Sequence, residues 1–425
     1  MKIAIIGAGI SGLTAAYHLR HDHQITVLEG NSYVGGHTNT IDVEESGKVY
    51  AVDTGFIVFN YRTYPNFKKM LDALDVASQP TSMTFSVKCD RTGLEYRGAD
   101  LPGFFAQRRN LFRPRYYVFL RDMLRFNRLA QATLVHPAAA EETLTVREFF
   151  DRHPFSQEFI EHYFLPMGSA VWSCPRGVFM EFPIRFIVEF YKNHGMLAVQ
   201  GRPQWRVIQG GSRQYVGPLT AQFAEALETE CPVTSVRRVG ERVKIQSRRG
   251  EEMFDHVIFA CHSDQALQIL GDTATATECE LLGAFPYEEN VTLLHTDTSV
   301  LPVCRRAWAA WNYHVPQEDT GKATVTYNMN ILQGLSTERT YCVTLNGEDR
   351  IDPAKVIRRM VYHHPVFTAQ RAEFQRRHGE LIDHHGISYC GAYWGNGFHE
   401  DGVNSALAVC SQLSGAPRQE LGVQG

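Results

Sequence analysis

Residues 1–19 place a glycine-rich turn between a short apolar segment and an apolar helix. Residues 1–6 are almost continuously apolar, which is typical of a central parallel strand covered on both faces. Gly7, Gly9 and Gly12 follow at once, and residues 13–19 continue as a helix. Residues 24–29 predict a second strand, and it ends in an acid. This order of strand, G-x-G-x-x-G turn, helix and strand predicts a dinucleotide-binding α/β unit.

Each residue of this unit has its own expected role. Gly7 permits the tight turn, Gly9 lets the backbone approach a pyrophosphate, and Gly12 lets the helix pack close to the strand. The helix N-terminus offers unpaired N–H groups to the phosphates. The Glu29 carboxylate can accept hydrogen bonds from ribose hydroxyls, and it would repel a 2′-phosphate. This acid alone does not separate NAD from FAD.

The next segment, Gly35-Gly36-His37-Thr38-Asn39-Thr40, separates the two cofactors. It resembles the GG-R-x-x-S/T pattern that follows the ribose acid in the flavin amine oxidase and phytoene desaturase superfamily. His37 stands where arginine is usual, which puts that phosphate contact in doubt. The resemblance resumes in four later stretches, at 51–56, 233–236, 255–261 and 389–406.

The resemblance implies FAD, bound without covalent attachment, as the cofactor. In the last motif Ala392 replaces the family's usual acid, so Glu400 or Asp401 is expected to supply the ribityl contact. The glycine-rich turn and the resemblance together assign cofactor contacts to Gly7, Gly9, Ile10, Ser11, Gly12, Glu29, Gly36, His37, Thr38, Gly55, Phe56, Val236, Ala260, Glu400, Asp401, Gly402 and Val403.

The implied fold class is α/β: a doubly wound, Rossmann-like FAD-binding domain of the glutathione-reductase type, with an inserted α+β substrate domain. The flavin-like motifs fall in separate stretches, so we expect a discontinuous FAD-binding domain at 1–75, 205–262 and 385–425. The substrate domain would then consist of a helical first insert at 76–204 and a strand-rich second insert at 263–384.

Local patterns within the inserts predict particular elements. They indicate helices at 64–74 and 353–363, a hairpin formed by 83–89 and 94–96, a mainly helical stretch at 103–200, and strands at 291–295, 323–327 and 340–345. The histidine pairs at 363–364 and 384–385 have no accompanying ligand set, so we interpret them as ordinary loop residues and expect no metal.

Composition excludes several classes of protein. The formal net charge is −4 over 425 residues, which gives no indication of a nucleic-acid partner. Nine cysteines are scattered without a CxxC pair, which favours reduced thiols in a cytoplasmic protein. No apolar run reaches the ~18 residues of a spanning helix. Lys2 and the apolar residues after it imitate a signal peptide, but the dinucleotide turn explains them better.

Residues 104–128 combine seven arginines with many aromatic and aliphatic residues. Tyr116, Phe119, Leu120 and Met123 follow helical spacing, with Arg121, Arg125 and Arg128 on the opposite face. Two interpretations stay open. The helix either lies on an anionic membrane, at the inner face of the cell membrane, or packs its apolar stripe into the core and leaves a solvated arginine face.

Candidate catalytic residues come from the stretches that the resemblance puts beside the flavin. His295 and His399 are candidates for proton transfer, and Tyr393 is a candidate for the wall of the substrate cavity, with Trp394 beside it. His399 serves equally well as a helix cap, and the aromatic pair as ordinary packing. Residues 287–297 contain no lysine, whereas amine oxidases of the superfamily commonly place one near flavin N5.

Several motifs together resemble one bacterial branch of the superfamily, whose members include the methylated-fatty-acid desaturase of furan fatty acid synthesis. These are Gly36–Thr40, Asp53–Asn60, Leu294–Asp297, Trp308–Tyr313 and Gly397–Gly402. The resemblance implies desaturation of a methyl-branched fatty acyl chain of a lipid, with a methyltransferase of the same pathway as a partner. The alternatives are a flavin amine oxidase and a non-catalytic flavoprotein scaffold in a lipid-modifying complex.

Overall fold

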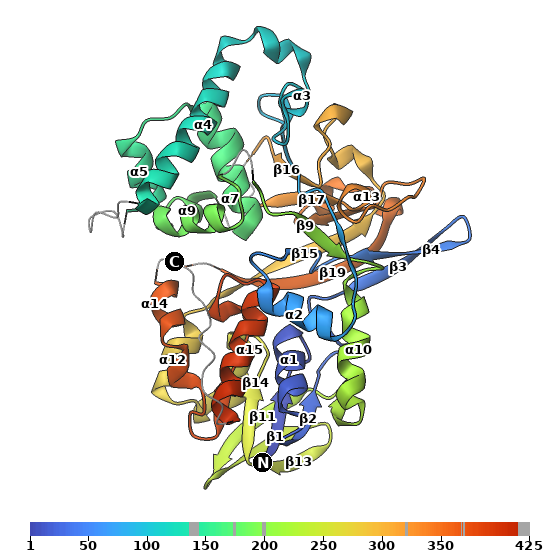
Figure 1. Ribbon diagram of the computed structural model, residues 1–425, viewed down its shortest axis with the longest axis vertical. Coiled ribbons are helices and arrows are strands. Elements are labelled where there is room, and N and C mark those ends of the chain that lie inside the picture. Colours follow the sequence, from blue (N-terminus) through green and yellow to red (C-terminus); the bar gives the residue numbers. More distant parts are fainter. Residues whose placement is uncertain are drawn as a thin grey trace.

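A five-stranded parallel sheet forms the centre of one half of the molecule in the computed structural model (Figure 1). The structure describes residues 1–135, 144–172, 176–197, 201–318, 322–366, 368 and 370–414. Residues 415–425 of the predicted flavin domain therefore lie outside it. The strand order is β10-β2-β1-β14-β20, with bounds Leu227–Glu228, Gln24–Leu28, Lys2–Ile6, His256–Phe259 and Ile387–Tyr389.

Strand β1 is buried on both faces, as its apolar sequence predicts. Ile3 and Ile5 pack toward the helices α1 (Ile10–Leu19) and α15 (His399–Leu413), which lie side by side on one face (Figure 1). Ala4 and Ile6 point to the other face because successive strand residues alternate. That face is covered by β11 (Val233–Val239), β12 (Arg242–Ser247), β13 (Gly250–Phe254), α11 (Ser263–Leu270) and α12 (Ala276–Gly283).

The two helices α11 and α12 lie at the start of the predicted substrate domain, but they pack with the parallel sheet. Ala266, Leu270 and Leu281 share a hydrophobic cluster with Val257 and Tyr389. Further short elements also border this half of the molecule: α2 (Pro65–Ala73), α10 (Val216–Thr220), α14 (Arg371–Arg376) and η12 (Ala392–Trp394). The helix predicted at 64–74 is thus present as α2.

A seven-stranded mixed sheet forms the base of the other half. Its order is β19-β15-β18-β17-β16-β7-β8, with bounds Val356–Pro365, Tyr287–His295, Cys342–Leu345, Thr324–Asn328, Trp311–Val315, Phe85–Cys89 and Leu94–Arg97. The hairpin β7–β8 and the strands β15, β17 and β18 agree with the sequence-based prediction. The short helix α13 (Met329–Leu332) follows β17.

The helix predicted at 353–363 is wrong. Residues 356–365 form strand β19, which pairs with β15 along its length, Val361 opposite Val291 and Tyr362 opposite Asn290. Val356, Ile357 and Val361 are β-branched and favour a strand. The local pattern was ambiguous, and the open edge of β15 decided the conformation, because a paired edge satisfies the backbone N–H and C=O groups.

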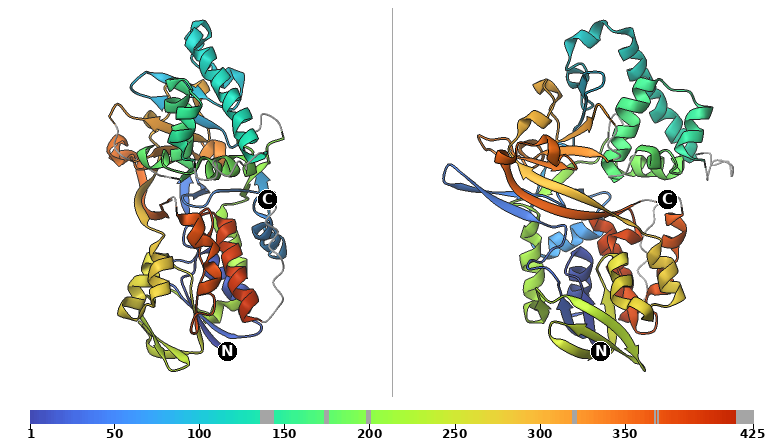
Figure 2. Two further views of the ribbon diagram at one scale, coloured as in Figure 1. Left: turned by 90° about the vertical axis from the view of Figure 1, so that its left-hand side faces the viewer. Right: turned by 180° about the vertical axis from the view of Figure 1, so that it is seen from behind.

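Helices gather above this sheet and form the helical first insert. They are α3 (Leu101–Phe104), η1 (Arg108–Phe112), α4 (Pro114–Val135), α5 (Val146–Arg152), α6 (Gln157–Phe159), α7 (Leu165–Trp172), α8 (Arg176–Phe179) and α9 (Ile184–Asn193). Their shared core is rich in phenylalanine. Both views in Figure 2 put the start of α4 at the end of the molecule opposite the N-terminus.

Two small sheets connect the halves. The hairpin of β3 (Thr40–Glu45) and β4 (Lys48–Asp53) projects to one side, and β9 (Trp205–Ile208) pairs with both β5 (Val58–Asn60) and β6 (Ser78–Pro80). Within the described residues, no helix is long and apolar enough to cross a bilayer. The same residues contain no group of three or more potential metal ligands placed to hold an ion.

Candidate active site

The turn after β1 has the geometry that a dinucleotide requires. Gly7 has φ +103°, and a Cβ on Gly12 would overlap the Gly7 carbonyl oxygen, so both positions demand glycine. An added Cβ on Gly9 would meet no heavy atom within 4 Å, so its surroundings are open. Helix α1 begins at Ile10 without a side-chain cap, and its first N–H groups, including that of Ser11, are available to an anion.

Glu29 lies directly beyond β2 and is buried. Its carboxylate accepts hydrogen bonds from the Ala8 N–H at 2.7 Å and from the Asn31 backbone and side-chain N–H groups at 2.8 and 2.9 Å. These bonds fix the acid beside the glycine-rich turn, as expected for a ribose ligand. A carboxylate has about four lone-pair sites, so acceptor capacity remains for a hydroxyl.

The second glycine pair packs directly on the first motif. Gly35 donates its N–H to the Ala8 carbonyl at 2.9 Å, and a Cβ on Gly36 would lie 3.2 Å from the Gly9 Cα atom. Gly55 approaches the same segment so closely that a Cβ would overlap the His37 carbonyl oxygen. Three glycine-dependent contacts therefore bring residues 7–9, 35–37 and 55 together, as the resemblance predicts.

His37 belongs to a cluster of aromatic rings and imidazoles at this junction. Its ring stacks on Tyr362 at 5.0 Å and lies 5.6 Å from His364 and 6.1 Å from His262. Burial and neighbouring imidazoles lower the pKa of His37 to about 4 and those of His262 and His364 to about 3. The atoms His37 Nε2 and His364 Nδ1 are buried without a hydrogen-bond partner.

This histidine cluster fits an anion better than it fits a metal. Two ring nitrogens of the cluster have no hydrogen-bond partner, the segment of His37 packs on the glycine-rich turn, and an imidazole N–H can donate a hydrogen bond to phosphate. The cluster includes His37, which stands in the sequence motif where the superfamily usually has arginine. The sequence alone gave no reason to bring His262 or His364 to this position.

His399 is held by a second, fully buried polar network. Its Nε2 atom lies 3.0 Å from both Thr38 Oγ1 and Tyr215 Oη, and these two oxygens are 2.6 Å apart. The His399 ring also stacks on Phe56, with centroids 3.4 Å apart. Burial lowers the pKa of His399 well below its ordinary value, so the imidazole is neutral. The structure therefore brings the candidates Thr38, Phe56 and His399 together, with Tyr215 as a member that the sequence analysis did not name; their roles stay predictions.

The N-terminus of α15 lies against the N-terminus of α1. A Cβ on Gly402 would lie 2.8 Å from Ile10 and 2.9 Å from the Ser11 hydroxyl, so α1 and α15 approach closely there. The Asp401 carboxylate accepts the Phe398 N–H at 2.9 Å, and burial raises the pKa of Asp401 to about 7. Val403 is buried behind Gly402.

The Glu400 carboxylate binds the start of α2 and not the place where α1 and α15 approach each other. Its two oxygens accept the N–H groups of Asn66 and Phe67, both at 2.9 Å, and so cap the N-terminus of α2. Burial raises the pKa of Glu400. Of the two acids proposed for the ribityl contact, Glu400 is engaged at α2, whereas Asp401 directly precedes Gly402, which packs on the start of α1. The ribityl assignment itself stays a prediction.

Two other predicted cofactor residues have distinct surroundings. Ala260 lies at the end of β14, and its carbonyl oxygen would be 2.9 Å from a Cβ on Gly7, so it borders the turn. Val236 pairs with Ile245, and its carbonyl accepts the Thr273 hydroxyl at 3.2 Å. A backbone contact with the Glu29 segment comes instead from Cys231, whose N–H donates to the Glu29 carbonyl at 2.8 Å.

His295 is enclosed in the seven-stranded sheet. Its Nδ1 atom accepts the Asp297 N–H at 3.0 Å, and its Nε2 atom lies 2.7 Å from the Thr344 hydroxyl. Burial lowers its pKa to about 4, so the ring is neutral. Both nitrogens are therefore engaged, and no described contact joins His295 to His399. Its catalytic assignment stays a prediction, and the contacts favour a structural role.

Tyr393 lies in η12 and packs on Phe285 at 5.2 Å and on Trp394 at 5.2 Å. Its buried hydroxyl has no partner, and burial raises its pKa well above the ordinary value. The Arg371 guanidinium donates to the carbonyl oxygens of Tyr393 and Gly395, at 3.1 and 2.8 Å. The role of Tyr393 as a cavity wall stays a prediction.

Asp53, at the end of β4, is the most extensively bonded buried carboxylate of this region. Oδ1 accepts from the Thr40 hydroxyl at 2.6 Å and from the Ser212 N–H and hydroxyl at 2.8 and 2.9 Å. Oδ2 accepts from the Gln333 amide at 2.9 Å, and Gln333 in turn accepts the Asp53 N–H. Burial raises the pKa of Asp53 to about 6.

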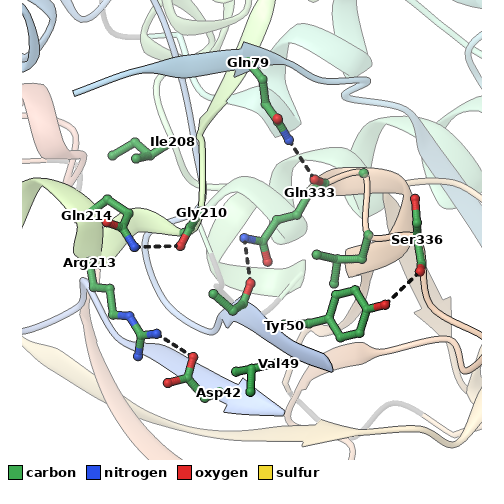
Figure 3. Close-up of a pocket in the computed structure, with 14 residues that line it drawn as sticks. Asp42, Val49, Tyr50, Gln79, Ile208, Gly210, Arg213, Gln214, Gln333 and Ser336 are labelled. Atoms are coloured by element: carbon green, nitrogen blue, oxygen red, sulfur yellow. Dashed lines mark hydrogen bonds and ion pairs between the residues drawn. The ribbon is translucent and has the colours of Figure 1, made fainter. Parts of the chain in front are cut away.

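Outside this network lies an open pocket of about 490 Å³ between the β3–β4 hairpin and residues 333–336 (Figure 3). Asp42 and Arg213 form an ion pair at its rim, and the Tyr50 hydroxyl donates to the Ser336 carbonyl at 3.1 Å. Gln333 separates the pocket from buried Asp53. The pocket contains none of the predicted site residues.

These observations fit a flavin dinucleotide. The open backbone at Gly9, the uncapped start of α1, the buried Glu29 and the unpaired His37 nitrogen all belong to one edge of the parallel sheet. Residues 7–12 and His37 would hold the pyrophosphate, and Glu29 would hold the ribose. The start of α15 would face the ring end of the cofactor.

Comparison with known proteins decides the family. The family model described as "Flavin containing amine oxidoreductase" matches residues 10–288, more than half of the chain. The chain belongs to this family. It is therefore a flavin-dependent oxidoreductase, and its cofactor is FAD. As a member of the family it has the expected α/β fold, with a parallel Rossmann-like sheet and a mixed substrate-domain sheet.

One curated relative of this flavin-dependent oxidoreductase matches over a short stretch. The flavin-dependent L-tryptophan oxidase RebO of Lentzea aerocolonigenes is 42% identical over 55 residues, which are 13% of this chain and 12% of that oxidase. The match thus spans about an eighth of the relative.

Solved structures share the fold of this flavin-dependent oxidoreductase over nearly its whole length. Cyclohexylamine oxidase from Brevibacterium oxydans is 18% identical with a TM-score of 0.65, covering 97% of this chain and 99% of that one. The fatty acid isomerase from P. acnes is 14% identical with a TM-score of 0.66, covering 96% and 98%. At these identities the likeness shows the fold alone.

Proposed function

We propose that this amine oxidoreductase family member desaturates a methyl-branched fatty acyl chain of a lipid. The observation that carries the proposal is the aromatic contact between the helical insert and the start of α15. Phe398, the N-cap residue of α15, packs on Phe190 at 5.5 Å, and His194 stacks on Phe190 at 3.9 Å. The ring of Trp205 lies 6.0 Å from that of His194.

The electrostatics of this contact favour an apolar substrate. Burial lowers the pKa of His194 to about 4, so its ring is neutral, and its Nδ1 atom pairs with the Phe190 carbonyl at 2.9 Å. The nearby Arg62 cation also lowers the pKa of His194 and would repel a substrate ammonium group, while the buried Asp401 carboxylate is engaged by the Phe398 N–H. The adjacent sheet strand β15 contains no lysine.

The reaction would remove two hydrogens from adjacent carbons. Bound FAD supplies the hydride acceptor at N5. One C–H bond would give a hydride to the cofactor and the neighbouring C–H bond a proton to a base, and oxygen or another acceptor would reoxidise the cofactor. The protein's share is to hold the acyl chain among aromatic rings and to exclude water. A methyl-transfer reaction would supply the branched substrate.

The comparisons give limited support. The fatty acid isomerase from P. acnes shares the fold, so this architecture accommodates a fatty acid in one protein of known structure. The oxidases of cyclohexylamine and putrescine share the fold as well, and they keep an amine oxidase activity as the competing hypothesis.

The discriminating experiment is anaerobic mixing of purified, FAD-loaded protein with candidate substrates. Methyl-branched acyl phospholipids or acids should bleach the flavin absorbance, whereas primary amines should not. Bleaching by amines alone would establish the amine oxidase alternative, and bleaching by neither would favour the scaffold. Phe398→Ala should slow bleaching without loss of bound FAD, and Val49→Ala, at an exposed hairpin residue, is the matched control.

A further inference from the structure

We propose that the tip formed by η1 and the exposed face of α4 docks on an anionic lipid bilayer. We call it the arginine–aromatic tip and define it by the exposed residues Arg108, Arg109, Leu111, Phe112, Arg113, Arg115, Tyr117, Arg121, Leu124 and Arg128. It lies at the end of the molecule opposite the N-terminus (Figures 1 and 2). The inference does not depend on the proposed substrate.

Large apolar side chains of the tip stand in solvent. Phe112 is 87% exposed, Leu124 53%, Tyr117 49% and Leu111 40%. Single exposed apolar residues are ordinary on protein surfaces, but several in one short segment mark an interaction site.

The arrangement on α4 mixes these apolar residues with arginines on a single face. At 100° per residue, Tyr117, Arg121, Leu124 and Arg128 fall within about 60° of one another around the helix axis. Leu111, Phe112 and Arg113 directly precede the helix. The apolar and basic residues therefore form one continuous surface along the tip.

The charge of the tip has a single sign. Asp122 is the only acid among residues 101–135, and it is buried; its carboxylate accepts the Ser156 N–H at 2.9 Å and pairs with the Arg121 guanidinium at 3.3 Å, while the Arg121 side chain itself stays exposed. Arg125 is not part of the tip, because it is only partly exposed: it donates to the Pro154 carbonyl at 2.6 Å and its guanidinium lies over the Phe155 ring. Arg108 and Arg109 also donate to backbone carbonyls but stay exposed.

The structure changes the form of the membrane hypothesis. Tyr116, Phe119 and Phe126, on the apolar stripe of α4, are buried in the phenylalanine-rich core of the helical insert. Helix α4 therefore cannot lie on a bilayer through that stripe. The membrane contact would come from the opposite face of α4 and from η1. Of the arginines that the sequence analysis placed on the basic face, Arg125 is therefore excluded, and Phe112 is the main apolar residue of the membrane-facing surface.

A bilayer fits this surface better than an acidic protein does. Arginine binds phosphate groups in bidentate fashion, while Phe and Leu enter the boundary between head groups and acyl chains, and Tyr favours that interface. Arginines spread over η1 and four turns of a helix match a plane of anionic head groups. The partner chemistry is therefore an anionic phospholipid surface.

The test is flotation of the FAD-loaded protein with vesicles of phosphatidylcholine alone or mixed with phosphatidylglycerol. At low salt the protein should bind the mixed vesicles and ignore the neutral ones, and binding should fall as salt is raised. Phe112→Ser should weaken binding about ten-fold, the scale of one buried aromatic side chain. Replacing Arg113, Arg121 and Arg128 by Gln should weaken it about five-fold per arginine at most.

Matched controls lie far from the tip. Val49→Ser removes an exposed apolar residue of the β3–β4 hairpin, and a triple variant with Arg237, Arg248 and Arg358 replaced by Gln removes the same charge from exposed strand and turn positions. Both should bind mixed vesicles like the wild type. Unchanged flavin content and unfolding midpoint in every variant show that the fold is intact.

Three outcomes would overturn the proposal. The first is wild-type protein that ignores mixed vesicles at low salt. The second is equal loss of binding in the tip and control variants. The third is a dimer, detected by ultracentrifugation and abolished by Phe112→Ser, in protein that binds no vesicles, which would assign the tip to a second copy of the chain. Failure of the desaturase assay would leave vesicle binding unaffected, so the two proposals fail separately.

Discussion

The imidazole of His399 stacks on the phenyl ring of Phe56, with centroids 3.4 Å apart and ring planes inclined by 10°. The stack joins the start of α15 to the turn after β4, two segments separated by more than 300 residues of chain. On its other side His399 reaches Thr38 and Tyr215, at 3.0 Å each. One residue therefore connects three of the flavin motifs.

This relationship predicts strong coupling between His399 and Tyr215. His399→Phe keeps a ring beside Phe56 but loses the hydrogen bonds, and Tyr215→Phe loses one hydroxyl from the same network. Each should lower the free energy of unfolding by about 1–2 kcal/mol. Because the two side chains share hydrogen-bond partners, the loss of unfolding free energy in the double variant should be at least about 0.5 kcal/mol smaller than the sum of the losses in the two single variants. Urea unfolding measures all three values.

Tyr50→Phe is the matched control for this cycle, because its hydroxyl bonds the Ser336 carbonyl at an exposed site. It should cost little, and its effect should add to that of His399→Phe within experimental error. Additive effects of His399→Phe and Tyr215→Phe would show that the two side chains do not act as one network.

The histidine cluster predicts that FAD binds more tightly as the pH falls. In the free protein the pKa of His37 is about 4 and that of His364 about 3, both below the ordinary 6.5. A nearby pyrophosphate stabilises the imidazolium and raises these pKa values, so binding takes up protons. Affinity therefore increases as pH falls from 7.5 to 6. Flavin fluorescence titration at each pH measures the dissociation constant.

Variants of His37 separate this pH dependence of FAD binding from the destabilisation of the whole protein at low pH. His37→Gln should flatten the pH dependence, and His37→Arg, which restores the usual residue, should give pH-independent binding. His21→Gln, at an exposed surface position, should behave like the wild type. His363, Tyr287 and Tyr362 also face the cluster and stay unchanged throughout. A steep pH dependence in His37→Gln would assign the proton uptake to other groups.

The same lowered pKa values have the opposite effect on stability: without FAD, a lower pH should destabilise the protein. A histidine whose folded pKa lies below its unfolded value favours folding only while it is neutral. The stability of the FAD-free protein should therefore decrease as pH falls from about 6.5 toward 4, and saturating FAD should offset part of that decrease. Unfolding midpoints at pH 7.5 and 5.5, with and without FAD, test the sign.

Sequence reasoning recovered the parts of the site that depend on backbone geometry. Gly7 and Gly12 predicted the turn, because only glycine fits the positive φ of Gly7 and the close approach at Gly12. Apolar runs predicted β1 and β2, since strands covered on both faces have few alternatives. The second glycine pair, Gly35 and Gly36, packs beside the first motif, and both residues have the positive φ that favours glycine.

Side-chain networks could not be predicted, because their members are distant in sequence. Nothing local to Tyr215 points to Thr38 or His399, and nothing local to Gln333 points to Asp53. The glycine pair 210–211 after β9 was the available signal for the Ser212 contact with Asp53. Strand β19 was missed because its conformation is set by pairing with β15, a long-range property.

The Asp53 network makes a stability prediction. In Asp53→Asn the new side-chain amide would face the Gln333 side-chain N–H group, which donates to Asp53 Oδ2 in the wild type. Gln333 cannot turn its side-chain oxygen toward the new amide, because that oxygen accepts the backbone N–H of residue 53. The mismatch should cost about 1–3 kcal/mol. Because burial raises the pKa of Asp53 to about 6, the wild-type carboxyl contributes more below that pH. The cost should be larger at pH 5 than at pH 7.5.

Asp42→Asn is the control for this measurement. Asp42 is an exposed partner of Arg213 at the pocket rim, so its loss should cost less than about 1 kcal/mol. Urea unfolding of both variants at the two pH values gives the comparison. Equal costs for Asp53→Asn and Asp42→Asn would contradict the assigned network.

Glu29 should determine the affinity for the ribose. Glu29→Ala removes the acceptor that Ala8 and Asn31 hold in place, and FAD binding should weaken by about 1.5–3 kcal/mol, the scale of hydrogen bonds to a charged acceptor. Glu44→Ala, at an exposed position of β3, is the control. Calorimetric titration of the FAD-free variants measures the change, and unchanged affinity would show that Glu29 is not the ribose ligand.

FAD should be released without breaking a covalent bond. Cys390 lies in the C-terminal flavin motif, but it is completely buried, and burial raises the pKa of its thiol well above the ordinary value. Its thiolate, the form that would attack a flavin, is therefore scarce. Acid precipitation should leave a colourless pellet and a yellow supernatant, in the wild type and in Cys390→Ser alike. A yellow wild-type pellet that turns colourless in Cys390→Ser would establish a covalent link at this cysteine.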